Sequence, residues 1–187
     1  MRLKEARIAP LQDDEFTEEQ KEAVLPLASW GRVLNIFRTL LRAPRAFKRF
    51  NVWGGYVLSD KNDLPPRERE IIILRVGYLC SSGYEWAQHE VIGRDCGLTD
   101  IEIQRIKEGP ASPLWNDLER AMLTAADELV RDHFVSDGTW AALSPLTDKQ
   151  KMDVVFTVGQ YTQVSMMLNS FGVQLDDGLT LDPDLTR

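Results

Sequence analysis

Hydrophobic residues recur every three or four positions along most of the chain, and this spacing predicts amphipathic helices. No segment shows the sustained alternation of apolar and polar residues that is typical of a half-buried strand. The expected fold class is therefore all-α. Turn and cap signals divide the chain into about nine helical segments, expected near residues 17–27, 36–42, 44–58, 64–79, 84–96, 99–109, 115–133, 136–143 and 147–171.

Local chemistry sets the ends of these segments. Thr17 and Thr99 each stand three residues before a glutamine or glutamate, which is the spacing of a capping box. Pro44 and Pro66 suit the first turn of a helix, where no backbone N–H is needed. The acidic tail at 176–187 has one proline and is expected to be extended or docked on a neighbour.

An internal similarity relates residues 64–79 to residues 146–161, which align without gaps. Both segments begin with leucine, carry basic residues three and five positions later, and contain Val-Gly near their ends. This pattern suggests two related helical hairpins that pack about a pseudo-twofold axis.

Length and charge restrict the function classes. Residues 1–187 are expected to form a single domain with its own core. The formal net charge of −7 would repel nucleic acid and anionic membrane surfaces, so neither is expected as a partner. No secretory signal and no membrane-spanning run is visible, which predicts a cytoplasmic protein. Cys80 and Cys96 fit neither a paired redox motif nor a zinc site and are expected to be small buried residues.

The helix expected from Tyr84 carries the candidate chemistry. At 100° per residue, Glu85, His89, Ile92 and Cys96 share one face, so a carboxylate and an imidazole four residues apart can touch. A buried face with such groups needs paired or protonated partners, as at sites with shifted pKa values.

The preceding helix supplies a second carboxylate. It is apolar nearly all round, and Glu70 shares a face with Leu74 and Gly77, where the missing side chain permits a close crossing. The short connection to the next helix makes the two antiparallel neighbours, so Glu70 is expected to face His89 in one buried cavity. Two alternatives stay open: the Glu–His pair could be a structural bond, or Glu70 could be solvated near the helix N-terminus.

Other residues have weaker patterns. Tyr84 could donate to a substrate oxyanion, and Trp86 could wall the pocket, so both are predicted substrate-binding residues. Gly54 and Gly55 inside a helix suggest a kink or a close approach beside a ligand. Three arginines could recognise a substrate carboxylate, although ion pairs at the surface are commoner for this residue type: Arg67, Arg69 and Arg75. Four tryptophans are expected to be core or interface anchors: Trp30, Trp53, Trp115 and Trp140.

The Glu-bearing segment from Leu64, the Tyr-Glu-Trp-x-x-His run at 84–89 and the Gly-Leu-Thr at 97–99 resemble the carboxymuconolactone decarboxylase family. The resemblance is strongest over residues 64–106. It implies the compact helical bundle of the alkyl hydroperoxidase D-like proteins, a homo-oligomer, a small-molecule substrate, and catalysis without metal or other cofactor.

The chain departs from the peroxidase branch of that fold. That branch carries Cys-x-x-Cys before its histidine, and the corresponding positions here are Ser82 and Glu85. A disulfide-cycling peroxidase needs a thiolate and a resolving partner, so this activity is disfavoured. Glu70 and His89 carry over from both branches.

The resulting hypothesis is a cofactor-independent, decarboxylase-type lyase acting on a small unsaturated carboxylic acid or lactone from aromatic-compound catabolism. His89 is the expected proton donor, because its ordinary pKa lies near neutral pH, and Glu85 or Glu70 would orient it. The alternatives are a thiol-dependent redox protein and a non-catalytic binding domain. A cavity closed by side chains around His89 would favour the binding domain, whereas an open apolar cavity would favour the enzyme.

Overall fold

The computed structural model describes residues 2–30 and 32–186, without the side chains of residues 28–30. The expectation for the Trp30 side chain therefore lies outside the described part of the chain. Within this part of the chain there are nine α-helices and no β-strand, which confirms the all-α prediction. The helices are α1 (Glu18–Val24), α2 (Asn35–Leu40), α3 (Pro44–Leu58), α4 (Pro66–Leu79), α5 (Gly83–Asp95), α6 (Asp100–Glu108), α7 (Asp117–Asp132), α8 (Asp137–Ala142) and α9 (Asp148–Phe171).

The caps explain why these segments begin and end where they do. Capping boxes with both hydrogen bonds open α1 at Thr17, α6 at Thr99 and α9 at Thr147. α9 ends where Gly172 adopts a left-handed conformation with φ of 69°. Local sequence chemistry therefore sets most helix ends.

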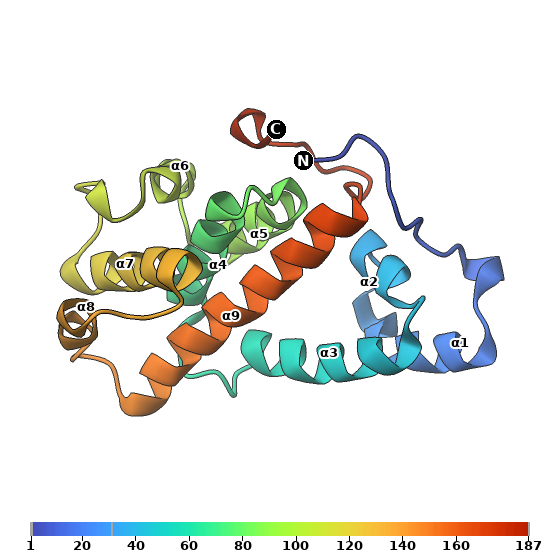
Figure 1. Cartoon of the computed structure of the whole chain (residues 1–187), viewed down its shortest axis with the longest axis horizontal. Coiled ribbons are helices and arrows are strands. Elements are labelled where there is room, and N and C mark those ends of the chain that lie inside the picture. Colours follow the sequence, from blue (N-terminus) through green and yellow to red (C-terminus); the bar gives the residue numbers. More distant parts are fainter. Residues whose placement is uncertain (1, 31, 187) are drawn as a thin grey trace.

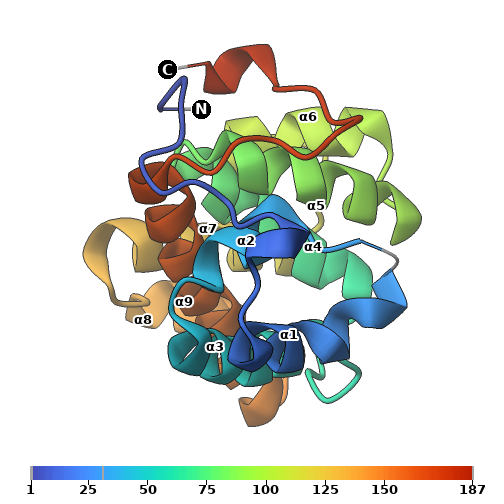
Figure 2. The same cartoon turned by 90° about the vertical axis from the view of Figure 1, so that its right-hand side faces the viewer.

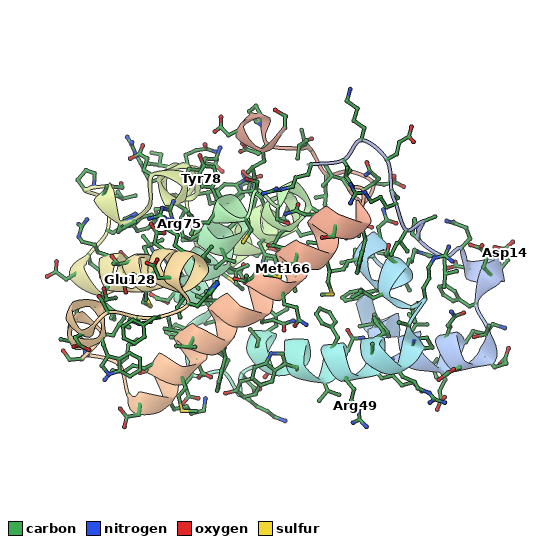
Figure 3. All side chains as sticks on the ribbon, in the orientation of Figure 1. Asp14, Arg49, Arg75, Tyr78, Glu128 and Met166 are labelled. Atoms are coloured by element: carbon green, nitrogen blue, oxygen red, sulfur yellow. The ribbon has the colours of Figure 1, made fainter. Side chains whose placement is uncertain are left out.

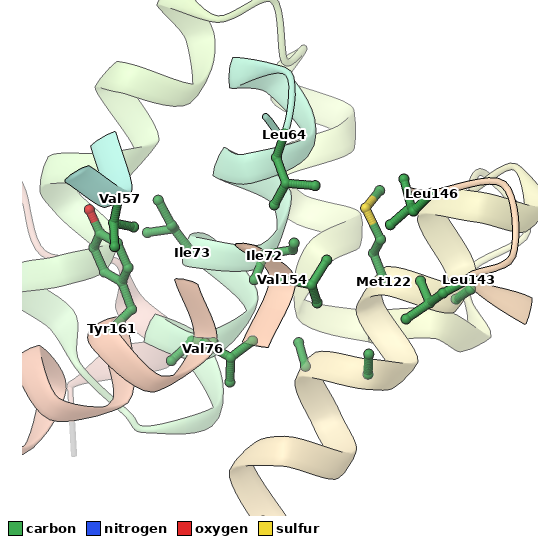
Figure 4. Packing of buried hydrophobic residues seen from close by; sticks show 14 residues of the cluster. Val57, Leu64, Ile72, Ile73, Val76, Met122, Leu143, Leu146, Val154 and Tyr161 are labelled. Atoms are coloured by element: carbon green, nitrogen blue, oxygen red, sulfur yellow. The ribbon is translucent and has the colours of Figure 1, made fainter. Parts of the chain in front are cut away.

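α4 is the central helix of the larger part of the molecule (Figure 1). Ile71, Ile72, Ile73 and Leu74 are fully buried, because neighbouring helices cover α4 on all sides. Ile72 and Ile73 pack with α7 and α9, and Figure 4 shows this cluster with Tyr161 at its edge. Ile71 and Leu74 pack with α5 and α6 in a second cluster.

The first three helices form a separate layer beside α9 (Figures 1 and 2). Their small core contains Leu27, Leu41 and Phe47. The layer is tied to α9 by the Tyr56 hydroxyl on α3, which donates to the buried Asp153 carboxylate at 2.6 Å. This hydrogen bond fixes α3 against α9.

The two segments of the internal similarity, residues 64–79 and 146–161, differ in how the chain continues after them. α4 turns back into α5 as a hairpin, whereas α9 continues as one helix of 24 residues and is followed by the tail. The tail docks on its own chain: Leu185 is buried beside α6, and the Lys107 ammonium binds the Asp182 and Asp184 carboxylates at 2.7 and 2.9 Å.

Most charged side chains point outward, as Arg49 on α3 does in Figure 3. Arg75, labelled in the same view, is instead buried and bound by both carboxylate oxygens of Asp127, at 2.6 and 2.8 Å. Among the described residues no helix has the length and apolar character needed to cross a membrane.

Candidate active site

A cavity of about 430 Å³ lies between the layer of α2 and α3 and the helices α5 and α9. This volume is within the range of sites that bind small molecules. Most of its wall is apolar, including side chains from Leu27, Ile36, Phe37, Phe50 and Val164. Its polar lining comes from Asn51, Ser59, Tyr84, Glu85, Gln88, His89, Gln160 and Tyr161.

Glu70, Glu85 and His89 form one buried cluster at this wall. The His89 Nδ1 atom lies 2.6 Å from Glu70 Oε2, and its Nε2 atom lies 3.0 Å from Glu85 Oε1. The exposed fractions are 1% for Glu70, 4% for Glu85 and 6% for His89. His89 and Glu85 line the cavity, whereas Glu70 lies behind the imidazole. The predicted contact between His89 and a glutamate is confirmed, whereas the expectation that Glu70 also lies in the cavity is wrong, because the imidazole stands between it and the open space.

Two glycines let α4 and α5 approach closely enough to form the cluster. A Cβ atom added at Gly77 would lie 3.6 Å from Glu85 Cγ. At Gly93 on α5, an added Cβ atom would lie 3.1 Å from Leu98 Cδ1 and 4.0 Å from Glu70 Cβ. A side chain at Gly93 would crowd Leu98 and shift α5 relative to α4, which would separate Glu70 on α4 from His89 on α5.

The two carboxylates determine the protonation state of the imidazole. Burial alone would lower the pKa of His89, but the negative charges and hydrogen bonds of Glu70 and Glu85 outweigh it and raise this pKa to about 10. His89 is therefore an imidazolium at neutral pH, with Nδ1–H donating to Glu70 and Nε2 within ion-pair distance of Glu85. Such a cluster stores a proton beside the cavity. The carboxylates bind opposite ring nitrogens, so the three residues do not converge on one point.

The chain is similar to known proteins in sequence and in fold. Residues 44–128 match the carboxymuconolactone decarboxylase family. This segment, a little under half of the chain, is similar to that family, as the sequence resemblance predicted. No curated protein sequence matches the chain significantly.

Solved structures with low sequence identity share the fold of this chain. The alkylhydroperoxidase core of a peroxidase-related protein from Ralstonia eutropha superposes with a TM-score of 0.80 at 21% identity, over 92% of this chain and 93% of that chain. A peroxidase-related protein from Silicibacter gives 0.74 at 17% identity, over 94% and 92%. A variant of the debrominase Bmp8, in complex with 2,3,4-tribromopyrrole, gives 0.75 at 14% identity, over 93% and 94%.

The thiol pattern of the peroxidase branch is missing at the corresponding positions of this chain. Ser82 is fully buried, and Glu85 contacts His89. Cys80 and Cys96 are both free and only partly buried, and burial raises the pKa of each thiol. A raised pKa leaves less thiolate at neutral pH, which is unfavourable for a redox nucleophile. Among the described residues no group of three or more potential ligands could hold a metal ion.

The structure places the predicted substrate-binding residues differently. Tyr84 lines the cavity, but its hydroxyl donates to the Asp176 carboxylate of the tail, so it is not free to bind a substrate oxyanion. Trp86 does not line the cavity, and this prediction is corrected. Its ring is fully buried with Ile71 and Leu74, because one step along the helix turns it about 100° away from Glu85.

The three arginines considered for substrate recognition do not line the cavity either. Arg67 pairs with Glu102 and Glu119, and Arg75 pairs with Asp127. Arg69 donates to the carbonyl oxygen of Ser59 at 3.1 Å, and its buried Nε atom has no hydrogen-bond partner among the described residues. The ion pairs of Arg67 and Arg75 join α4 to its neighbouring helices.

The sequence reasoning missed several lining residues, among them two on α9. Gln160 and Tyr161 come from α9, and the Tyr161 ring packs edge-on against the imidazole of His89 at a centroid distance of 4.9 Å. Burial, reinforced by the charges of Glu85 and Glu70, raises the pKa of Tyr161 well above its usual value, so its hydroxyl keeps its proton. No sequence signal distinguishes these positions from ordinary core positions on a long helix.

Proposed function

We propose that this protein is a cofactor-independent, decarboxylase-type lyase that acts on a small unsaturated carboxylic acid or lactone from aromatic-compound catabolism. The observation that carries the proposal is the Glu70–His89–Glu85 cluster at the wall of an apolar cavity. Three buried ionisable groups are expensive to keep for packing alone, whereas proton transfer requires them. The open space beside His89 favours an enzyme over a binding domain closed by its own side chains.

The proposed reaction uses each part of the site. In the apolar cavity the substrate carboxylate loses its water shell, the C–C bond to it breaks, and carbon dioxide leaves. The electron pair spreads onto a conjugated carbonyl oxygen as a dienolate, and a carbon of that system then takes a proton. His89 is the proton donor through Nε2, with Glu85 able to relay the proton over 3.0 Å and Glu70 holding the ring at Nδ1.

The structural relatives support the kind of ligand rather than the reaction. The debrominase variant was solved with a small halogenated ring, so a related fold accommodates a compact, largely apolar molecule. The wall of the cavity described above is largely apolar, which suits such a molecule.

A homo-oligomer in the cytoplasm belongs to the same proposal. Exposed apolar side chains on α3 and α9, such as Trp53 and Met152, favour association.

The test is a panel of small unsaturated lactones and carboxylic acids incubated with the protein in D₂O. Mass spectrometry would follow loss of carbon dioxide and uptake of one deuterium into the product. Wild type and the His133→Gln variant, which alters the other histidine, should turn over the same compound, whereas His89→Gln should lose at least about a hundredfold, the usual contribution of a general acid. No turnover by wild type, or full turnover by His89→Gln, would contradict the proposal.

A further inference from the structure

Arg69 on α4 is a buried arginine without an acidic partner. It is 7% exposed, and no carboxylate oxygen of the described residues lies within 4.0 Å of its nitrogen atoms. Its guanidinium donates to the Ser59 carbonyl oxygen at 3.1 Å, and its buried Nε atom has no partner in the described part of the chain. Arg75, on the same helix, is also buried but pairs with Asp127 at 2.6 Å. A buried charge without a counter-ion is costly, so the place of Arg69 needs an explanation.

Arg69 lies at the edge of the active site. Ser59, whose carbonyl oxygen it binds, lines the cavity. One helical turn after Arg69, Ile73 packs in the same core cluster as Tyr161 (Figure 4). The charge of Arg69 acts on the Tyr161 hydroxyl together with the charges of both carboxylates of the cluster. Because the Tyr161 ring also packs against the imidazole of His89, the guanidinium and the imidazole are neighbours of the same ring.

The other groups that face His89 from the described lining carry no charge. α2 contributes apolar side chains, and the polar lining from α3 and α9 consists of amides and hydroxyls: Asn51, Ser59, Gln160 and Tyr161. Burial raises the pKa of Tyr84 and of Tyr161, so both hydroxyls keep their protons. The Asp176 carboxylate of the tail does not line the cavity and accepts hydrogen bonds from three donors of its own. The charges at this wall are therefore those of the cluster and of Arg69.

Arg69 brings these buried charges into balance. Two ionised carboxylates and one imidazolium give the cluster a single negative charge, and the guanidinium, which is always protonated, compensates for it. When His89 gives up its proton, the carboxylates are left beside a neutral ring, and Arg69 is the positive charge that remains. A positive charge close to an imidazolium favours loss of its proton.

We propose that Arg69 is a positioning residue of the active site, whose buried guanidinium offsets the charge of Glu70 and Glu85 and so allows His89 to release its proton to the substrate. This inference rests on the proposed proton-transfer function and adds a residue to it. The proton leaves Nε2 of His89, and the electron pair of the dienolate forms the new C–H bond. The neutral imidazole regains a proton from water after the product has left. Arg69 touches neither the proton nor the substrate and acts through the imidazole.

The alternative is that Arg69 serves the fold alone. Its guanidinium binds a carbonyl oxygen at the C-terminal end of α3, where a cation suits the helix dipole. The two roles predict different effects on the imidazole. Removing a nearby positive charge raises the pKa of His89 above its value of about 10. A loosened α4 instead lets water reach the cluster, which lowers this pKa towards the ordinary value of about 6.5.

The experiment follows the His89 imidazole by nitrogen NMR as pH is raised, in the His133→Gln background. Arg69→Met and Arg69→Gln remove the charge, and glutamine keeps an amide donor for the Ser59 carbonyl oxygen. In both variants the pKa of His89 should rise by about one pH unit, the effect of one nearby charge. Arg69→Lys keeps the charge and should titrate like wild type. In the D₂O assay the two charge-removing variants should be roughly three- to tenfold slower, because a more basic imidazole is a weaker acid.

Arg67→Met is the matched control. Arg67 lies on the same helix but does not line the cavity, and it pairs with Glu102 and Glu119. Its replacement removes the same charge from α4 and should leave the pKa of His89 near its wild-type value.

The inference is overturned if the pKa of His89 is unchanged or lower in both charge-removing variants, or if Arg69→Lys or Arg67→Met raises it as much. Failure of both charge-removing variants to fold would show that the guanidinium is kept for the structure, and this would also overturn it. The NMR measurement needs no substrate, so failure of the proposed function is separate. The expected rise in pKa without turnover of any compound contradicts the reaction alone. Turnover that depends on His89, without a rise in pKa, contradicts the role of Arg69 alone.

Discussion

Replacing His89 by phenylalanine should destabilise the protein far more than replacing the whole cluster. In His89→Phe the carboxylates of Glu70 and Glu85 lose the group that holds them at 2.6 and 3.0 Å, while both remain almost fully buried. Removing one partner of a buried ion pair typically costs about 3–5 kcal/mol. This is a large fraction of the roughly 5–15 kcal/mol by which a domain is stable.

The triple replacement Glu70→Leu, Glu85→Leu and His89→Phe leaves no charge in the cluster. Apolar groups of similar size in place of a buried ionic cluster are commonly neutral or stabilising by about 1–4 kcal/mol. If the cluster is kept for chemistry, the triple variant should unfold at an equal or higher urea concentration than wild type and should have no activity. This is the trade-off between stability and function seen at active sites.

Urea unfolding at pH 7, followed by circular dichroism, compares the three proteins. As an internal check, the deficit of His89→Phe should shrink at lower pH, because the stranded carboxylates can then take up protons. A triple variant as unstable as the single variant would refute the reasoning. It would show that the cluster is a structural bond between α4 and α5.

Four further outcomes follow from the same contacts. The free energy of unfolding of wild type should fall as pH rises from about 6.5, the ordinary pKa of histidine, to about 10, because folded His89 keeps a proton that the unfolded chain releases. Equilibrium unfolding across this range should show this dependence on pH in wild type and not in the triple variant. Cys80 and Cys96 should react slowly with a thiol reagent at pH 7, and alanine at both should leave turnover unchanged; loss of turnover would revive a thiol mechanism. Asp176→Asn should lower stability by about 1–3 kcal/mol in thermal melts, because Tyr84 and two other donors lose a charged acceptor; an unchanged melting temperature would mean that the tail contact is unimportant. Activity should survive exhaustive chelation, and loss that is restored by added metal would show a metal enzyme.

The sequence was sufficient for features that depend on neighbouring residues. α3 begins at Pro44 and ends at Leu58 as predicted, because cap, proline and turn chemistry act within a few residues. The contact between Glu70 and His89 was also predictable, since a short connection and helical phase fix two adjacent helices against each other.

Features that depend on distant packing were not predictable. Gln160 and Tyr161 reach the site from a helix about seventy residues further along the chain, and nothing in their local pattern separates them from core residues. The prediction for Trp86 was wrong because α5 is buried on two sides. A ring next to Glu85 could therefore line the cavity or pack in the core with α4, and Trp86 packs in the core. The hydrogen-bond partner of Tyr84 is Asp176 in the C-terminal tail. The sequence indicated that this tail is acidic but not which residue its carboxylates contact.

The most direct test of the central claim is the protonation state of His89, measured by nitrogen NMR of protein labelled in histidine. The chain has only two histidines, so the His133→Gln variant leaves a single imidazole signal. The account predicts that at pH 8 both ring nitrogens of His89 carry protons that exchange slowly with water, because the ring is buried and each nitrogen lies within 3.0 Å of a buried carboxylate oxygen. A neutral ring at pH 8, titrating near the ordinary value of about 6.5, would contradict it.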